Sequence, residues 1–174
     1  MLRVFAKFDD EERALKAAGA LIDHGVGAEE FDLVGSPQLK ERLDGLTTTT
    51  AADAVRGASQ GGTAGLALGA LAGLASLFIP GYGLVIGSGA LATAAAAALG
   101  TGAAGVLTGG VAGYLQDMGV EEPIARDFED AVKDGAALIL IETEDQSREN
   151  EIVGLLNKYR VDRLQLASLA IEPT

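Results

Sequence analysis

The stretch GASQGGTAGLALGALAG, residues 57–73, places a glycine at every fourth position. These glycines are Gly57, Gly61, Gly65, Gly69 and Gly73. Five glycines in one helix cost on the order of 4–5 kcal/mol relative to alanine, so a helix here needs a compensating contact. Residues four apart share one helix face, and glycines leave on it a groove that another backbone can fill. We therefore interpret the stretch as a glycine zipper.

The zipper lies within a block of sixty residues, 57–116, that contains no Asp, Glu, Lys or Arg. All 13 basic and 25 acidic residues of the chain lie outside it. Residues 1–56 carry a net charge of −4 and residues 117–174 a net charge of −8, as expected for a solvated globular surface. The sequence thus combines one long uncharged block with two charged flanks.

The uncharged block is predicted to form a helical hairpin. Its first leg covers 57–79 and its second about 84–116, and Pro80 and Gly81 form the turn between them. Small residues recur at every fourth position of the second leg from Gly89 onward. The last three of these glycines, predicted as helix contacts together with the five of the first leg, are Gly105, Gly109 and Gly113. Regular leucines between the glycines disfavour a flexible linker.

The environment of the hairpin is left open by the sequence. A first leg of 23 residues would be about 35 Å long, enough to cross a bilayer core of about 30 Å. The second leg has 33 residues and at about 50 Å is too long for one span, unless the chain breaks near residue 101. The hairpin could span a membrane, lie on one, or be buried against other copies in a soluble oligomer.

The flanks are predicted to contain two strand–helix–strand units. The first has a strand at 2–8, a helix capped by Asp9 with Glu12 and ended near Gly25, and a strand at 31–34. The second follows a helix that begins at Glu121-Glu122-Pro123 and stops at Gly135. It comprises a strand at 136–141, a helix at about 147–159 and a strand at 163–167.

Two such units pair naturally into a four-stranded antiparallel sheet with helices on one face. The predicted fold class is α+β, a ferredoxin-like split βαβ sandwich with the Gly/Ala-rich hairpin inserted between its halves. Residues 1–46 form the first half, 47–56 a linker, 57–116 the hairpin and 117–174 the second half.

Composition argues against several function classes. A net charge of −12 excludes a nucleic-acid partner, because phosphate binding depends on Lys and Arg. With no cysteine and the single His24, a thiolate or His-rich metal site cannot form. His24 is expected at an exposed helix end. Pairs such as Glu11-Glu12 are expected to be helix-start acids on a solvated face. No glycine of the block is followed by the lysine of a phosphate-binding loop, so we predict no cofactor and no enzymatic activity.

Several segments together resemble a bacterial family. They are VFAKFDDEERALKAAGALIDHGV (4–26), FDLVGS (31–36), the central IPGYG (79–83) and GVEEPIARDFEDAVKDGAALILIET (119–143). This arrangement resembles the general-stress and low-temperature-induced protein family, whose members carry a heat-induced stress protein type domain. The resemblance implies a stress-linked, often membrane-associated protein without established enzymatic activity.

The sequence thus predicts a non-enzymatic stress-associated protein that self-assembles through the glycine-zipper hairpin and associates with or spans a membrane. Its partners would be other copies of itself and membrane lipid. The start of the chain lacks the apolar core of a signal peptide, so the α+β domain is expected in the cytoplasm. The alternative is a soluble homo-oligomer with the hairpins in its core and an α+β domain that binds a small molecule or protein.

Overall fold

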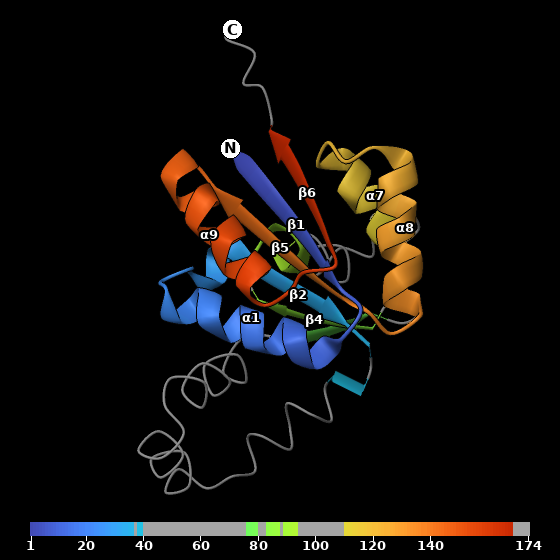
Figure 1. The fold of residues 1–174 in the computed structure, drawn as a ribbon. Coiled ribbons are helices and arrows are strands. Elements are labelled where there is room, and N and C mark those ends of the chain that lie inside the picture. Colours follow the sequence, from blue (N-terminus) through green and yellow to red (C-terminus); the bar gives the residue numbers. More distant parts are fainter. Residues whose placement is uncertain (37, 40–75, 80–82, 88, 94–109, 169–174) are drawn as a thin grey trace, which may run out of the picture.

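The computed structural model describes residues 1–36, 38–39, 76–79, 83–87, 89–93 and 110–168 (Figure 1). These residues form an α+β fold in which helices lie on both sides of one sheet. In chain order the elements are β1 (Leu2–Phe8), α1 (Glu11–Asp23), η1 (Ala28–Glu30), β2 (Phe31–Gly35), β3 (Ser76–Ile79), β4 (Gly83–Gly87), α7 (Gly110–Asp117), α8 (Glu122–Lys133), β5 (Ala137–Thr143), α9 (Gln146–Lys158) and β6 (Arg163–Ser168).

The sheet has six strands in the order β3-β4-β2-β5-β1-β6, and every neighbouring pair is antiparallel. β2 and β5 lie at its centre, and β1 pairs with the other side of β5, with Val4 opposite Ile141. β5 is buried on both faces, as its nearly continuous apolar sequence predicts. Four of the strands come from the charged flanks, as predicted, and the uncharged block adds β3 and β4.

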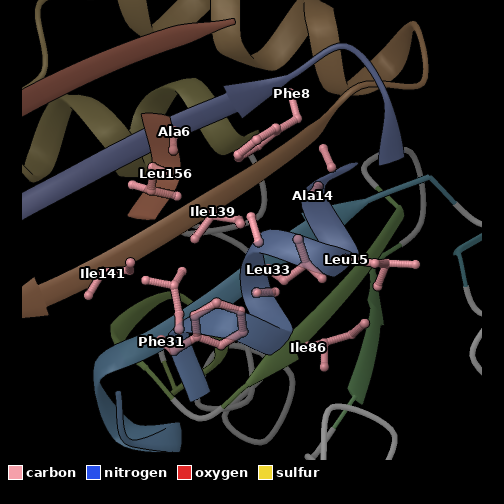
Figure 2. Packing of buried hydrophobic residues seen from close by; sticks show 14 of the residues in the cluster. Ala6, Phe8, Ala14, Leu15, Phe31, Leu33, Ile86, Ile139, Ile141 and Leu156 are labelled. Atoms are coloured by element: carbon pink, nitrogen blue, oxygen red, sulfur yellow. The ribbon is translucent and has the colours of Figure 1, made fainter. Parts of the chain in front are cut away.

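One face of the sheet is covered by α1 and α9, which contact each other (Figure 1). Their apolar sides pack on alternate residues of the strands, among them Phe31, Leu33 and Ile139 (Figure 2). Residues of opposite parity, such as Phe5 and Leu138, pack against α7 and α8 on the other face. The prediction that helices lie on one face only is therefore wrong, because both sets of alternate residues are apolar and each needs a cover.

The elements of the flanks are confirmed in position and type. α1 ends before Gly25, whose φ of +82° favours glycine, and α8 ends before Gly135 at φ +99°. The N-cap of α1, however, is Asp10 and not Asp9, because Asp10 Oδ1 accepts from the backbone N–H of Glu12 at 2.8 Å. Asp9 instead donates its backbone N–H to Asp162.

The two predicted helical legs are wrong where they cover 76–79 and 83–87, since these residues are strands β3 and β4. Both segments are short apolar runs, and such runs give no helix or strand periodicity to distinguish the two. β4 pairs with β2, which places Val34 opposite Val85. β3 and β4 are antiparallel, so the chain reverses between them, but Pro80 and Gly81 themselves lie outside the described residues.

Gly87 offers a direct test of β4. A Cβ at this position would lie 2.1 Å from the carbonyl oxygen of Phe31, and its φ is +132°. We expect Gly87→Ala to lower the free energy of unfolding by about 2 kcal/mol or more, measured by denaturant titration.

The matched control is Gly154→Ala on the exposed side of α9, where an added Cβ meets no atom within 4 Å. This variant should gain about 0.5–1 kcal/mol, because alanine favours a helix. A gain at both positions would mean that residues 83–87 are helical, contrary to the sheet described above.

Candidate functional site

The most unusual polar group in the described residues is the carboxylate of Asp32, in the middle of β2. Asp32 is 3% exposed and lies on the face covered by α7 and α8, which we call the anchor face. Its Oδ2 accepts the backbone N–H of Leu91 at 2.8 Å, and its Oδ1 accepts that of Ala92 at 3.2 Å. These donors belong to a helical turn that begins at residue 90. Asp32 therefore caps a helix start within the uncharged block.

Gly89 lets the chain come this close to β2. A Cβ at Gly89 would lie 2.5 Å from Asp32 Oδ2, and the Gly89 N–H donates to the carbonyl of Phe31 at 3.3 Å. The sequence pattern places this glycine in a regular series of small helix-contact residues. In the structure it instead fits the space between the block and a strand.

Burial changes the protonation of Asp32. It raises the pKa to about 6, against the effect of the N–H donors of Leu91, Ala92 and Gly89, and the charge of Glu142 raises it further. The ordinary value is 3.8. Asp32 therefore changes charge between pH 5 and pH 7, a range in which an ordinary aspartate stays ionised.

A second carboxylate holds the start of α7. Glu129 of α8 accepts the backbone N–H of Ala112 at 2.8 Å, and its other oxygen accepts Lys133 Nζ at 2.5 Å. Burial alone would raise the pKa of Glu129, but the hydrogen bonds from Lys133 and Ala112 and the nearby positive charges lower it below its ordinary value. Both helix starts described in the uncharged block are thus bound by acids of the charged flanks.

The end of α7 is held by a third polar contact. Arg3 of β1 forms an ion pair with Glu142 of β5 at 2.6 Å and donates to the carbonyl of Met118 at 3.2 Å. Tyr114 of α7 lies close to these groups. Burial raises the pKa of Tyr114 above its ordinary range, and the charges of Asp32 and Glu142 add to the effect.

Apolar packing completes the attachment. Leu91, Val111 and Leu115 of the uncharged block are buried against residues of the flanks, including Phe5 and Phe128. The anchor face thus combines an apolar contact with carboxylates that accept main-chain N–H groups. This arrangement fixes helices in place. Asp32 is the carboxyl group in it whose pKa is raised to about 6.

The predicted zipper residues are mostly outside the described residues. This applies to the seven glycines Gly57, Gly61, Gly65, Gly69, Gly73, Gly105 and Gly109. Gly113 is described, within α7, and an added Cβ there would meet no described atom within 4 Å. Its contact with another helix stays a prediction.

His24 follows α1 as predicted, is exposed, and lies 3.2 Å from a carboxylate oxygen of Glu151. Glu11 and Glu12 lie in the first turn of α1, which confirms them as helix-start acids, but the prediction that Glu11 lies on a solvated face is wrong. Glu11 is 7% exposed and accepts the backbone N–H of Ser36 at 2.7 Å. It acts as a link between α1 and the end of β2.

An acidic groove of about 390 Å³ lies between α8, the end of β1 and the residue before β5. It is lined by Lys7, Ala131, Ala136 and the aspartates Asp9, Asp127, Asp130 and Asp134. Two of these acids are paired, Asp9 with Lys7 at 3.2 Å and Asp127 with Arg163 at 2.5 Å. Across the part of the chain that the structure describes, no group of three His, Cys, Asp or Glu residues could hold a metal ion.

None of the helices among the described residues is both long and apolar enough to cross a membrane.

Comparison with protein-family models, with curated proteins and with solved structures gives no match to this chain. Its function must therefore be argued from its own residues.

The titration of Asp32 gives a prediction with a definite sign. Between pH 4 and pH 6 the native state holds a proton on Asp32 that the unfolded chain has released, so stability falls as pH rises through this range. From 3.8 to about 6 the loss amounts to about 3 kcal/mol. We expect Asp32→Asn to remove this dependence. The unfolding free energy of the wild type should then fall relative to that of the variant as pH rises from 4 to 6.

Glu129→Gln is the matched control, with the opposite sign. A lowered pKa stabilises the fold above the ordinary value of 4.5, and this stability is lost as pH falls below it. The unfolding free energy of the wild type should therefore increase relative to that of Glu129→Gln as pH rises. Denaturant titrations from pH 3.5 to pH 7.5 measure both. Parallel curves for Asp32→Asn and the wild type would contradict the buried carboxylate.

Proposed function

We propose that the chain is a non-enzymatic, stress-associated protein that self-assembles through its glycine-zipper segment and associates with membrane. Its core is a ferredoxin-like split domain that carries this segment as an insertion. The proposal combines the glycine spacing of the sequence with the way in which the described residues hold the uncharged block. The stress setting and the membrane partner come from the resemblance of segments such as 79–83 and 119–143.

The split domain is supported by the order of the flank strands. β1, α1 and β2 form one unit, and β5, α9 and β6 form the other. The four strands lie in the order β6-β1-β5-β2, and both helices contact the same face. This is the interleaved arrangement of two βαβ units expected of a ferredoxin-like core.

One observation carries the proposal: residues 40–75, which contain the zipper segment, follow one strand of the sheet and precede another. Residues 40–75 join β2 to β3, and these strands lie on either side of β4. Two strand spacings, about 10 Å, separate β2 and β3 across the sheet. Both strands are antiparallel to β4 and so parallel to each other, with Ser76 level with Leu33, and the chain leaves at the end of β2 and returns at the start of β3. An insertion that leaves and returns at nearby points can extend from the domain and meet the same segment of another copy. The glycine groove supplies the surface for that contact.

The same attachment limits how membrane enters the proposal. The legs 57–79 and 84–116 are not continuous helices, because β3 and β4 belong to the sheet. An excursion from the sheet that crosses a bilayer must cross twice, which takes at least about 34 residues, and 40–75 has 36, so hardly any would be left for a turn or for links to the sheet. This favours association with a membrane surface over crossing. It also favours the second candidate, a soluble oligomer in which the zipper segments pack together.

The zipper is tested by filling its groove. In the double variant Gly65→Leu, Gly69→Leu, bulky side chains replace two bare positions, and close helix contact is lost. We expect the wild type to sediment as a defined oligomer without detergent and the variant as a smaller species with unchanged far-UV circular dichroism. The control is Gly154→Leu, which adds the same side chain to an open position of α9. Unchanged assembly size in the double variant would refute the zipper.

Fractionation then separates the two candidates. Protein that floats with liposomes and leaves washed membranes in alkaline carbonate is associated with the surface. Protein that stays at the bottom of the gradient as a defined oligomer supports the soluble assembly. Retention in carbonate-washed membranes would contradict both surface association and the soluble oligomer, and would indicate that the chain spans the membrane.

A further inference from the structure

β6 forms one edge of the sheet. It pairs with β1 on one side, and no described strand pairs with its other side. Its residues 163–167 are all at least partly exposed, whereas those of β2 are buried. Leu166 is 47% exposed, more than any other large apolar side chain among the described residues. Such an edge offers backbone N–H and C=O groups to a further strand. The carbonyl of Leu166 accepts the side-chain amide of Gln165 at 3.1 Å, an exposed contact that a pairing strand can replace.

The sequence of β6 lacks the features that usually protect an edge. Natural edge strands carry charges, prolines or bulges that prevent pairing with another chain. After Arg163, the strand reads Leu-Gln-Leu-Ala-Ser, without a charge or proline. Arg163 itself is paired with Asp127 at 2.5 Å and lies over the ring of Phe128. The edge from Leu164 onward is thus suited to accept a strand.

We propose that β6 pairs antiparallel with β6 of a second copy of this chain, about a two-fold axis through Gln165. In this register Leu164 lies opposite the partner's Leu166, and Leu166 opposite the partner's Leu164. These leucines share one face of the sheet, because they are two residues apart. Each would cover the exposed leucine of the other copy, and the two sheets would become one continuous sheet.

Charge does not oppose pairing at this surface. The chain has a net charge of −12, so two copies repel each other in most orientations. β6 contributes one positive and no negative charge. In the proposed register Arg163 lies opposite the partner's Ala167, so no like charges meet across the axis. Because the overall repulsion is screened by salt, the dimer should become tighter as ionic strength rises.

This interface goes beyond the self-assembly proposed above. It involves only described residues at the β6 edge, whereas the zipper segment precedes β3 in the chain, and β3 is the opposite edge of the sheet. The two contacts are independent. One forms a symmetric pair, and the other joins glycine segments.

A single cysteine tests the register. The chain contains no cysteine, so Gln165→Cys introduces one thiol. Residues directly opposed in an antiparallel pair have Cα atoms about 4.5–5.5 Å apart, within the range that a disulfide can bridge. We expect mild oxidation of the full-length protein to give a disulfide-linked dimer within minutes. The control is Asn150→Cys on the exposed side of α9, which should form dimers at least tenfold more slowly.

Association is measured independently by sedimentation equilibrium of a charge variant. Leu166→Lys places like charges close together across the axis, and the residue is exposed, so the fold is retained. We expect the dimer dissociation constant to rise at least tenfold over the wild type, and to stay unchanged in Asn150→Lys, which adds the same charge elsewhere. Equal rates of disulfide formation in the two cysteine variants, or equal dissociation constants in the two lysine variants, would overturn the proposal.

The outcomes are distinguishable from those of the zipper experiment. Disulfide formation at residue 165 that persists in Gly65→Leu, Gly69→Leu confirms the edge interface whether or not the zipper assembles. Loss of assembly in the glycine variant without disulfide formation at residue 165 would leave the zipper and reject the edge interface.

Discussion

The attachment of an uncharged block to a charged domain depends on a buried carboxylate. Asp32 binds the main-chain N–H groups of Leu91 and Ala92 from within the central part of the sheet. Buried N–H groups at a helix start need an acceptor, and the block itself has no acidic side chain to supply one. Here the acceptor comes from a flank, as the carboxylate of Asp32. Glu129 accepts a main-chain N–H of α7 in the same way. Acidic side chains that bind backbone N–H groups thus join the uncharged block and the charged flanks into one fold.

This dependence explains why the middle of the chain is not a separate hairpin. β4 continues the sheet next to β2, and Leu91, Val111 and Leu115 complete the core of the anchor face. Without them the core on that face would keep the cover of α8 and lose that of α7 and Leu91. The flanks need part of the uncharged block for their own stability. The zipper segment lies within 40–75, between β2 and β3 in the chain.

Much of the flank structure could be predicted from local signals. Alternation in β1, the apolar run of β5 and the glycines after α1 and α8 depend on neighbours in sequence, so they locate strands and helix ends. β3 and β4 could not be predicted in this way, because their apolar residues suit a helix and a strand equally until a partner strand is known. The role of Asp32 was hidden for a similar reason. A lone acid between apolar strand residues was the available signal, but its partners are about sixty residues away in sequence.

Residues of the uncharged block are part of the domain core, and the hydrogen bonds from Leu91 and Ala92 to Asp32 hold them there. Amide hydrogen exchange at neutral pH, resolved by residue with NMR, tests it most directly. We expect the amides of Leu91, Ala92 and Val85 to exchange as slowly as those of β5, through global unfolding alone. Exchange of these three amides on the timescale of an exposed loop, with β5 still protected, would contradict it.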